Sequence, residues 1–81
     1  MKEDFTIQAR NEIAARFKKI REKRNLSLRQ LEALTGIGHS WLGKLENGKV
    51  NFQIDSLVKL MEALQIQPKE LFSFKLDYKE D

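Results

Sequence analysis

The residues Leu26–Lys49, LSLRQLEALTGIGHSWLGKLENGK, decide the fold of this chain. Ser27 is a favourable N-terminal cap for a helix, because its hydroxyl can accept a hydrogen bond from a backbone N–H of the first turn. Gly36 can take the positive φ that a sharp end to a helix requires. Between these two residues, leucines recur at the spacing of one helical face: Leu28, Leu31 and Leu34.

A third helix is predicted directly after the turn Thr35–Gly38, from about His39 to Glu46. Leu42 and Leu45 form its apolar stripe, and Asn47-Gly48 predicts its end. Two short helices joined by a three- to four-residue turn that contains glycine are the core of a helix-turn-helix.

The flanking sequence predicts three more helices, and its pattern does not require a strand. The first helix runs from about Ala9 to Arg24 and ends at Asn25, a residue that tolerates the left-handed conformation. The fourth runs from about Ile54 to Leu64, and the fifth is opened by Pro68 at its first helical position. The expected apolar residues of these helices are Ile13, Phe17 and Ile20, then Leu57, Leu60, Met61 and Leu64, then Leu71 and Phe72.

The expected organisation is one all-α domain of five helices, at residues 9–72. Residues 1–8 carry no strong pattern and are expected to form a flexible N-terminal arm. The tail 73–81 alternates apolar and charged residues, which fits either a short strand or a flexible end that contributes to dimerisation.

Length and composition exclude several classes of function. A chain of 81 residues buries only a modest core, and no cysteine is available for disulfides or thiolate metal sites. With His39 as the only histidine, no multi-histidine metal site can form. No apolar run is long enough to cross a bilayer, and no secretory signal is recognisable, so a cytoplasmic protein is expected. We expect neither a cofactor nor catalysis, because the sequence lacks a catalytic triad and a glycine-rich phosphate loop.

Charge is distributed unevenly along the chain. Residues 1–50 contain 11 Lys and Arg against 6 Asp and Glu, a net charge of +5, whereas residues 51–81 have a net charge of −2. This asymmetry fits a polyanionic partner on one face, although a solvated basic surface would give the same numbers. The outward face of the third helix is more specific, because its residues are all small, polar or cationic: His39, Ser40, Gly43, Lys44 and Asn47.

The joint pattern of Leu26–Lys49 and of SLVKLMEALQIQPKELF at residues 56–72 resembles the phage repressor and Cro-like (XRE-type) helix-turn-helix regulators. The resemblance extends from about Ile13 to Phe72. It implies a lambda-repressor-like fold and a repressor-like transcriptional regulator that binds double-stranded DNA in a sequence-specific manner. It further implies a homodimer on a near-palindromic operator, with the third helix of each copy in the major groove.

The resemblance also implies roles by position. Residues at base-contacting positions are His39, Ser40, Gly43 and Lys44. Residues at phosphate-contacting positions are Ser27, Leu28, Arg29, Asn47, Lys49 and Asn51. Arg21 and Glu46 match a pair that connects the first helix to the end of the third. Glu32 and Gly38 depart from the family, which often has alanine and a Ser or Thr cap at these positions.

Three points stay open at the level of sequence. Trp41 fits either partial packing on the core or a phosphate contact through its indole N–H. The same fold also serves antitoxin-type protein-interaction modules, which is the alternative function. The C-terminal apolar residues either cap the core or form a dimer interface, and we favour the interface. Its residues are Ile66, Leu71, Phe72, Phe74 and Leu76.

Overall fold

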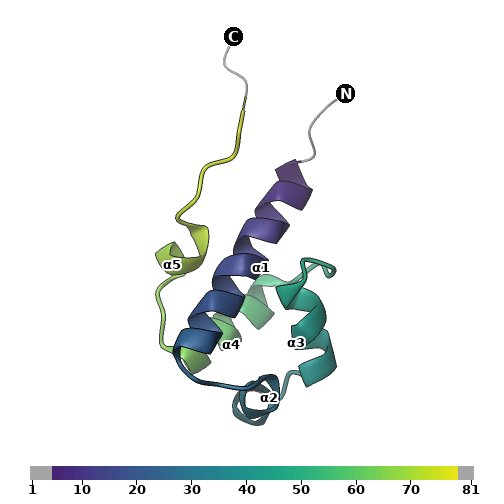
Figure 1. Cartoon of the computed structure of the whole chain (residues 1–81), viewed down its shortest axis with the longest axis vertical. Helices are drawn as coiled ribbons and strands as arrows, with labels where there is room; N and C mark the ends of the chain where they lie inside the picture. Colours follow the sequence, from purple (N-terminus) through teal and green to yellow (C-terminus); the bar gives the residue numbers. More distant parts are fainter. Residues whose placement is uncertain (1–4, 79–81) are drawn as a thin grey trace.

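The computed structural model describes residues 5–78 and contains five helices (Figure 1). They are α1 (Phe5–Lys23), α2 (Leu28–Thr35), α3 (His39–Glu46), α4 (Ile54–Leu64) and α5 (Pro68–Phe72). No strand occurs within the described range. The prediction of an all-α, five-helix fold is therefore confirmed.

The ends of α2 follow directly from its sequence. The Ser27 hydroxyl accepts a hydrogen bond from the backbone N–H of Gln30 at 3.0 Å, and the Gln30 side chain accepts one from the backbone N–H of Ser27 at 2.7 Å. This reciprocal pair is a capping box. At the other end, Gly36 adopts φ 76° and its N–H donates to the Glu32 carbonyl. Both predicted boundaries are confirmed.

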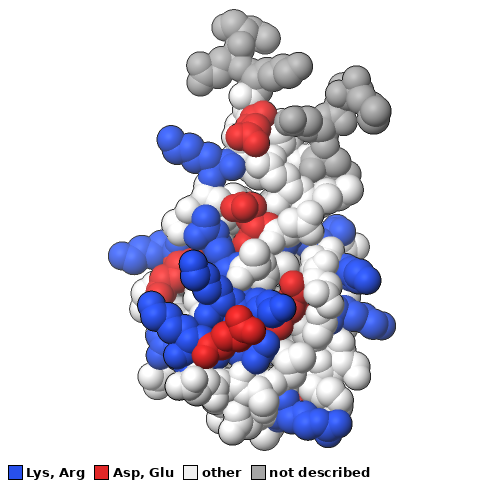
Figure 2. Space-filling view, viewed as in Figure 1, with Lys and Arg blue, Asp and Glu red and all other residues white. Residues whose placement is uncertain are grey.

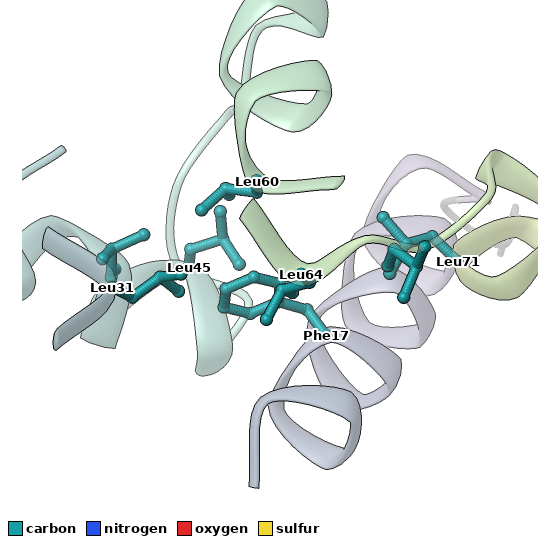
Figure 3. Close-up of a cluster of buried hydrophobic side chains, with 8 residues drawn as sticks. Phe17, Leu31, Leu45, Leu60, Leu64 and Leu71 are labelled. Carbon is teal, nitrogen blue, oxygen red and sulfur yellow. The ribbon is translucent and has the colours of Figure 1, made fainter. Parts of the chain in front are cut away.

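One hydrophobic cluster holds the helices together. Phe17 of α1 lies beside Leu45 of α3 and Leu64 of α4, as Figure 3 shows. The whole cluster is Phe17, Leu31, Leu42, Leu45, Leu60, Leu64, Ile66 and Leu71. Because α1, α2, α3 and α4 all contribute to it, the core fixes the orientation of α3 relative to the rest of the domain.

The structure corrects four expectations about packing. Leu34 was predicted on the inward face of α2, but it is 61% exposed, and Met61 is only half-buried. Ile66 and Leu71 were predicted in a dimer interface, yet they are 6% and 0% exposed. Ile66, in the segment between α4 and α5, and Leu71 of α5 both belong to the core cluster that contains Phe17 and Leu64, so neither is available to a partner chain.

The first helix begins at Phe5, four residues before the predicted start, so residues 5–8 do not belong to a loose arm. The reason is a tertiary contact with the C-terminal segment. The rings of Phe5 and Tyr78 pack edge to face with centroids 4.9 Å apart, and Gln8 donates a hydrogen bond to Asp77 at 3.0 Å. Residues 73–78 run beside α1 in extended conformation (Figure 1). Residues 1–4 and 79–81 of the predicted arm and tail lie outside the described residues.

Candidate nucleic-acid interface

The turn between α2 and α3 is fixed by side-chain hydrogen bonds as well as by glycine. The Thr35 hydroxyl donates to the Leu31 carbonyl at 2.8 Å and accepts from the Ile37 N–H at 3.1 Å. Ile37 packs against the core. These contacts set the angle at which α3 leaves the turn.

The two faces of α3 differ in burial as the sequence predicts. Leu42 and Leu45 are fully buried, whereas Ser40, Lys44 and the following Asn47 are exposed. Trp41 is half-buried and packs against the core, which favours the packing alternative for its ring. The outward face thus presents short polar groups and one flexible cation, a composition suited to donors and acceptors on base edges.

Gly43 lies in the middle of α3 with no internal contact that requires glycine. A Cβ built at this position would meet only Leu28 Cδ1, at the ordinary contact distance of 3.7 Å. Glycine within a helix costs about 1 kcal/mol relative to alanine. Gly43 is half-exposed, and the only neighbour that a Cβ would meet is Leu28 of α2, so the fold itself leaves room for a side chain at this position.

His39 opens α3 and is held by Glu32 of α2. The Oε1 atom of Glu32 lies 2.6 Å from His39 Nδ1 and also accepts the His39 backbone N–H at 3.1 Å. Gly38, the residue before α3, has no side chain with which to cap the helix, and Glu32 performs that function instead. The hydrogen bond from His39 lowers the pKa of Glu32 below its ordinary value.

Arg21 and Glu46 are brought together across the packed α1 and α3. Arg21 Nε and Glu46 Oε2 form one contact, and Arg21 Nη2 donates to Glu46 Oε1 at 3.0 Å. Arg21 Nη1 also donates to the Leu26 carbonyl at 2.6 Å. The side chains are only 12% and 6% exposed, and the hydrogen bond with Glu46 raises the pKa of Arg21. Arg21 therefore joins α1, the start of the α2 segment and the end of α3.

The loop after α3 carries the predicted residues Lys49 and Asn51, both exposed. Asn51 accepts a hydrogen bond from Arg10 Nη2 of α1. Gly48 has φ 70°, and a Cβ there would lie 2.3 Å from Asn11 Oδ1, so the loop backbone packs closely on α1. Arg10 and Asn11 were not predicted as site residues, because they contact a loop about forty residues further along the chain. Glu32 was noted only as a departure from the family, and its contact with His39 was not predicted.

The start of α2 supplies the remaining predicted phosphate contacts. Ser27 and Arg29 are exposed, and Leu28 is half-buried against the core. The backbone N–H groups in the first turn of a helix have no carbonyl partner within that helix. In α2, the Ser27 hydroxyl accepts one of them, the N–H of Gln30. The others are therefore suited to an anion, with the Arg29 guanidinium beside them on the first turn.

The basic residues divide into two groups. In Figure 2, most of the blue surface lies over α1 and α5 and is interleaved with acidic groups, while a smaller set lies along the edge where α3 is drawn. On the α5 side, Arg16 donates to Ser73 at 3.2 Å and lies over the Phe74 ring, and Lys23 lies beside Glu70. The cations on α2, α3 and the following loop are Arg29, Lys44 and Lys49.

Other kinds of site were also sought in residues 5–78. This part of the chain contains no group of three or more His, Asp or Glu residues arranged to hold a metal ion. Over the same range, every helix is too short or too polar to span a membrane.

Comparison with known proteins identifies relatives of the whole helical domain. Residues 17–71 match the helix-turn-helix family HTH_3. A search of curated proteins gives no match. Among solved structures, the restriction-modification controller protein C.AhdI from Aeromonas hydrophila is 34% identical, with a TM-score of 0.73, and the match covers 76% of this chain and 94% of that one.

Two further structures share the fold. An HTH_3 family transcriptional regulator from Vibrio cholerae is 29% identical with a TM-score of 0.78 over 84% of this chain, which spans 38% of the Vibrio protein. The restriction-modification controller protein C.Esp1396I, solved as a tetramer with its natural 35-base-pair operator, is 21% identical with a TM-score of 0.72. That match covers 88% of this chain and 90% of the controller protein.

Proposed function

The chain belongs to the HTH_3 helix-turn-helix family and is a sequence-specific DNA-binding transcription regulator, and from this premise we propose that it binds a near-palindromic operator as a homodimer. The observation that carries the proposal is the outward face of α3. Polar and cationic side chains cover this face, while Arg21–Glu46 and Glu32–His39 fix the helix at its two ends. A rigid helix of this kind fits the major groove.

The proposed roles separate base reading from backbone contact. His39, Ser40 and Lys44 contact base edges, and Gly43 allows the α3 backbone to approach them closely. Ser27, Leu28 and Arg29 hold one phosphate strand through the start of α2, while Asn47, Lys49 and Asn51 hold the other. The proposed role resembles that of the C.AhdI controller protein. We also assign the chain to the cytoplasm, where it would meet double-stranded operator DNA. HTH_3 is a family of DNA-binding regulators and not of enzymes.

Substitution of Lys44 tests the base-reading role. We expect Lys44→Ala to weaken binding to the preferred site by about 1–3 kcal/mol if it pairs with guanine, and to weaken binding to random duplex much less. Titrations of a site selected from random DNA, beside a scrambled duplex of equal length, measure the difference. Lys19→Ala is the matched control, because Lys19 is an exposed cation on the side of α1 that Arg16 shares. Equal losses on both duplexes would reduce Lys44 to a phosphate contact.

Gly43→Ala should affect folding and binding in opposite directions. We expect the substitution to raise the free energy of unfolding by about 0.5–1 kcal/mol, because alanine favours the helix and its Cβ meets only Leu28. We expect DNA affinity to fall about tenfold, because the methyl group would hold the α3 backbone away from the base edges. Thermal unfolding and DNA titration of the same preparation measure both effects. Unchanged affinity would contradict the close approach at this position.

The proposed dimer interface is smaller than the sequence analysis suggested, since Ile66 and Leu71 are in the core. Phe72 is 43% exposed, and its ring stacks with that of Phe74 at a centroid distance of 6.4 Å. Leu76 follows in the C-terminal segment, where it is half-buried and lines a hollow with Phe5 and Ile13 of α1. Pairing through these three residues leaves α3 of each copy free, as two half-sites about one DNA turn apart require.

Sedimentation of charged variants tests the interface. We expect Phe72→Glu combined with Leu76→Glu to convert a micromolar dimer into a monomer, because a two-fold axis would bring the new charges together. Leu34→Glu is the control, since Leu34 is an exposed leucine on α2, outside the proposed interface. A wild-type protein that sediments as a monomer, or a double variant that stays dimeric, would contradict the assignment.

A further inference from the structure

We propose that Glu32 is a positioning residue that fixes the tautomer of His39, and through it the base that His39 prefers. The inference rests on the proposed function, in which His39 faces the major groove. It goes beyond that function by assigning a specificity-determining role to a side chain of α2, a helix with no predicted base contact.

Two contacts on one oxygen define the geometry. Glu32 Oε1 contacts both the ring Nδ1 of His39, at 2.6 Å, and the backbone N–H of the same residue, at 3.1 Å. The ring is thereby held against the start of α3, with Nδ1 directed toward α2. The His39 and Glu32 side chains remain 37% and 42% exposed, so the pair lies at the surface of the domain.

The ionisation of Glu32 determines which ring nitrogen carries the proton. The hydrogen bonds from His39 lower the pKa of Glu32, and Arg29 on α2 acts in the same direction. At neutral pH Glu32 is therefore a carboxylate, which accepts hydrogen bonds and donates none. The Nδ1 atom of a neutral His39 must then carry the proton, and Nε2 is left as an acceptor.

An acceptor at Nε2 selects bases by their major-groove donors. Those donors are the N6 amine of adenine and the N4 amine of cytosine. The protein should therefore prefer adenine or cytosine at the operator position that His39 faces.

The tautomer is measurable without DNA. His39 is the only histidine, so proton–nitrogen correlation spectra of the imidazole need no assignment. We expect the Nδ1–H tautomer in the wild type at about pH 8, and its loss when Glu32 is removed. Since Glu32 also caps α3, we place Glu32→Ala in a Gly38→Ser background, whose hydroxyl restores a cap. The space around a Cβ at position 38 is open, and Gly38→Ser alone is the matched control.

Binding to operator duplexes with each of the four bases at the His39 position completes the test. We expect the wild type and Gly38→Ser to favour adenine or cytosine about three- to tenfold at pH 8, the value of one hydrogen bond. The Glu32→Ala, Gly38→Ser variant should bind the four duplexes within about twofold of one another at pH 8, because its imidazole exchanges freely between tautomers.

Each alternative outcome contradicts a defined part of the inference. An Nε2–H tautomer in the wild type would overturn the role of Glu32 before any DNA is added. A base preference that survives removal of Glu32 would overturn the link to specificity while leaving DNA binding intact. Failure of the wild type to bind any duplex would overturn the proposed function itself, and the reading role with it.

Discussion

Glu46→Ala should lower the free energy of unfolding by about 3–5 kcal/mol, a large part of the stability of a domain of this size. The substitution leaves the Arg21 guanidinium, whose side chain is only 12% exposed, without its carboxylate. It also breaks the connection between α1 and the end of α3, so DNA binding should fall with stability. Urea or thermal unfolding of the variant measures the loss.

A double-mutant cycle separates the interaction from the loss of either side chain. We expect the coupling between Arg21→Ala and Glu46→Ala to exceed 1 kcal/mol, the usual upper value for exposed ion pairs. The chain offers a control pair in Glu12 and Arg16, which lie 3.7 Å apart with side chains 43% and 33% exposed. Their coupling should be about 0.5 kcal/mol or less. Additive effects at Arg21 and Glu46 would contradict the structural role of the pair.

The affinity for operator DNA should fall about a thousandfold between 50 and 200 mM salt, because six neutralised phosphates give a slope of log K against log salt near −5. We expect Arg29 of α2 and Lys49 of the loop after α3 to contribute as phosphate contacts. Lys44 of α3, the proposed base-reading residue, adds a third cation in each protomer of the proposed dimer, and its charge also displaces counterions from the DNA. Among the cations of α1, Arg16 contacts Ser73, and Lys23 and Arg24 line a surface hollow together with Glu70 of α5.

Neutralising individual cations distinguishes the two groups. Lys49→Ala should reduce the slope by about two, one phosphate contact for each protomer, whereas Lys19→Ala and Lys23→Ala should leave it unchanged. A series of titrations at increasing salt gives all the slopes. A flat response of the wild type would contradict DNA binding through this surface. Equal reductions in all three variants would show that the DNA contacts the α1 face as well.

Local signals predicted the helical boundaries well. Each of these signals acts within its own turn. Ser27 caps the start of α2, and Gly36 ends that helix with a positive φ. Asn25 takes a positive φ just after α1, and Pro68 is the first residue of α5. The bounds of α3 and α4 were likewise predicted from their leucine spacing and flanking polar residues. Interactions of this kind depend only on neighbours in the chain, so sequence pattern is sufficient to find them.

The errors fall where distant segments meet. Leu34 fits a three-residue repeat, but two such steps place it about 120° around the helix from Leu28, and it is 61% exposed. The early start of α1 depends on Tyr78 and Asp77, about seventy residues away in sequence. Ile66 and Leu71 were predicted in the dimer interface but lie in the core, and their position depends on the path of the chain between α4 and α5.

The amino-acid sequence by itself determined the five helices, the turn between α2 and α3, and the polar face of α3, because capping, glycine geometry and leucine periodicity are local properties. The resemblance to a known family placed Arg21 opposite Glu46 and assigned His39 to the reading surface. Only the tertiary structure decided that Glu32 holds His39, that Arg10 and Asn11 support the loop after α3, and which apolar residues remain exposed. These contacts join side chains from separate helices, and their distances are set by the packing of the shared core.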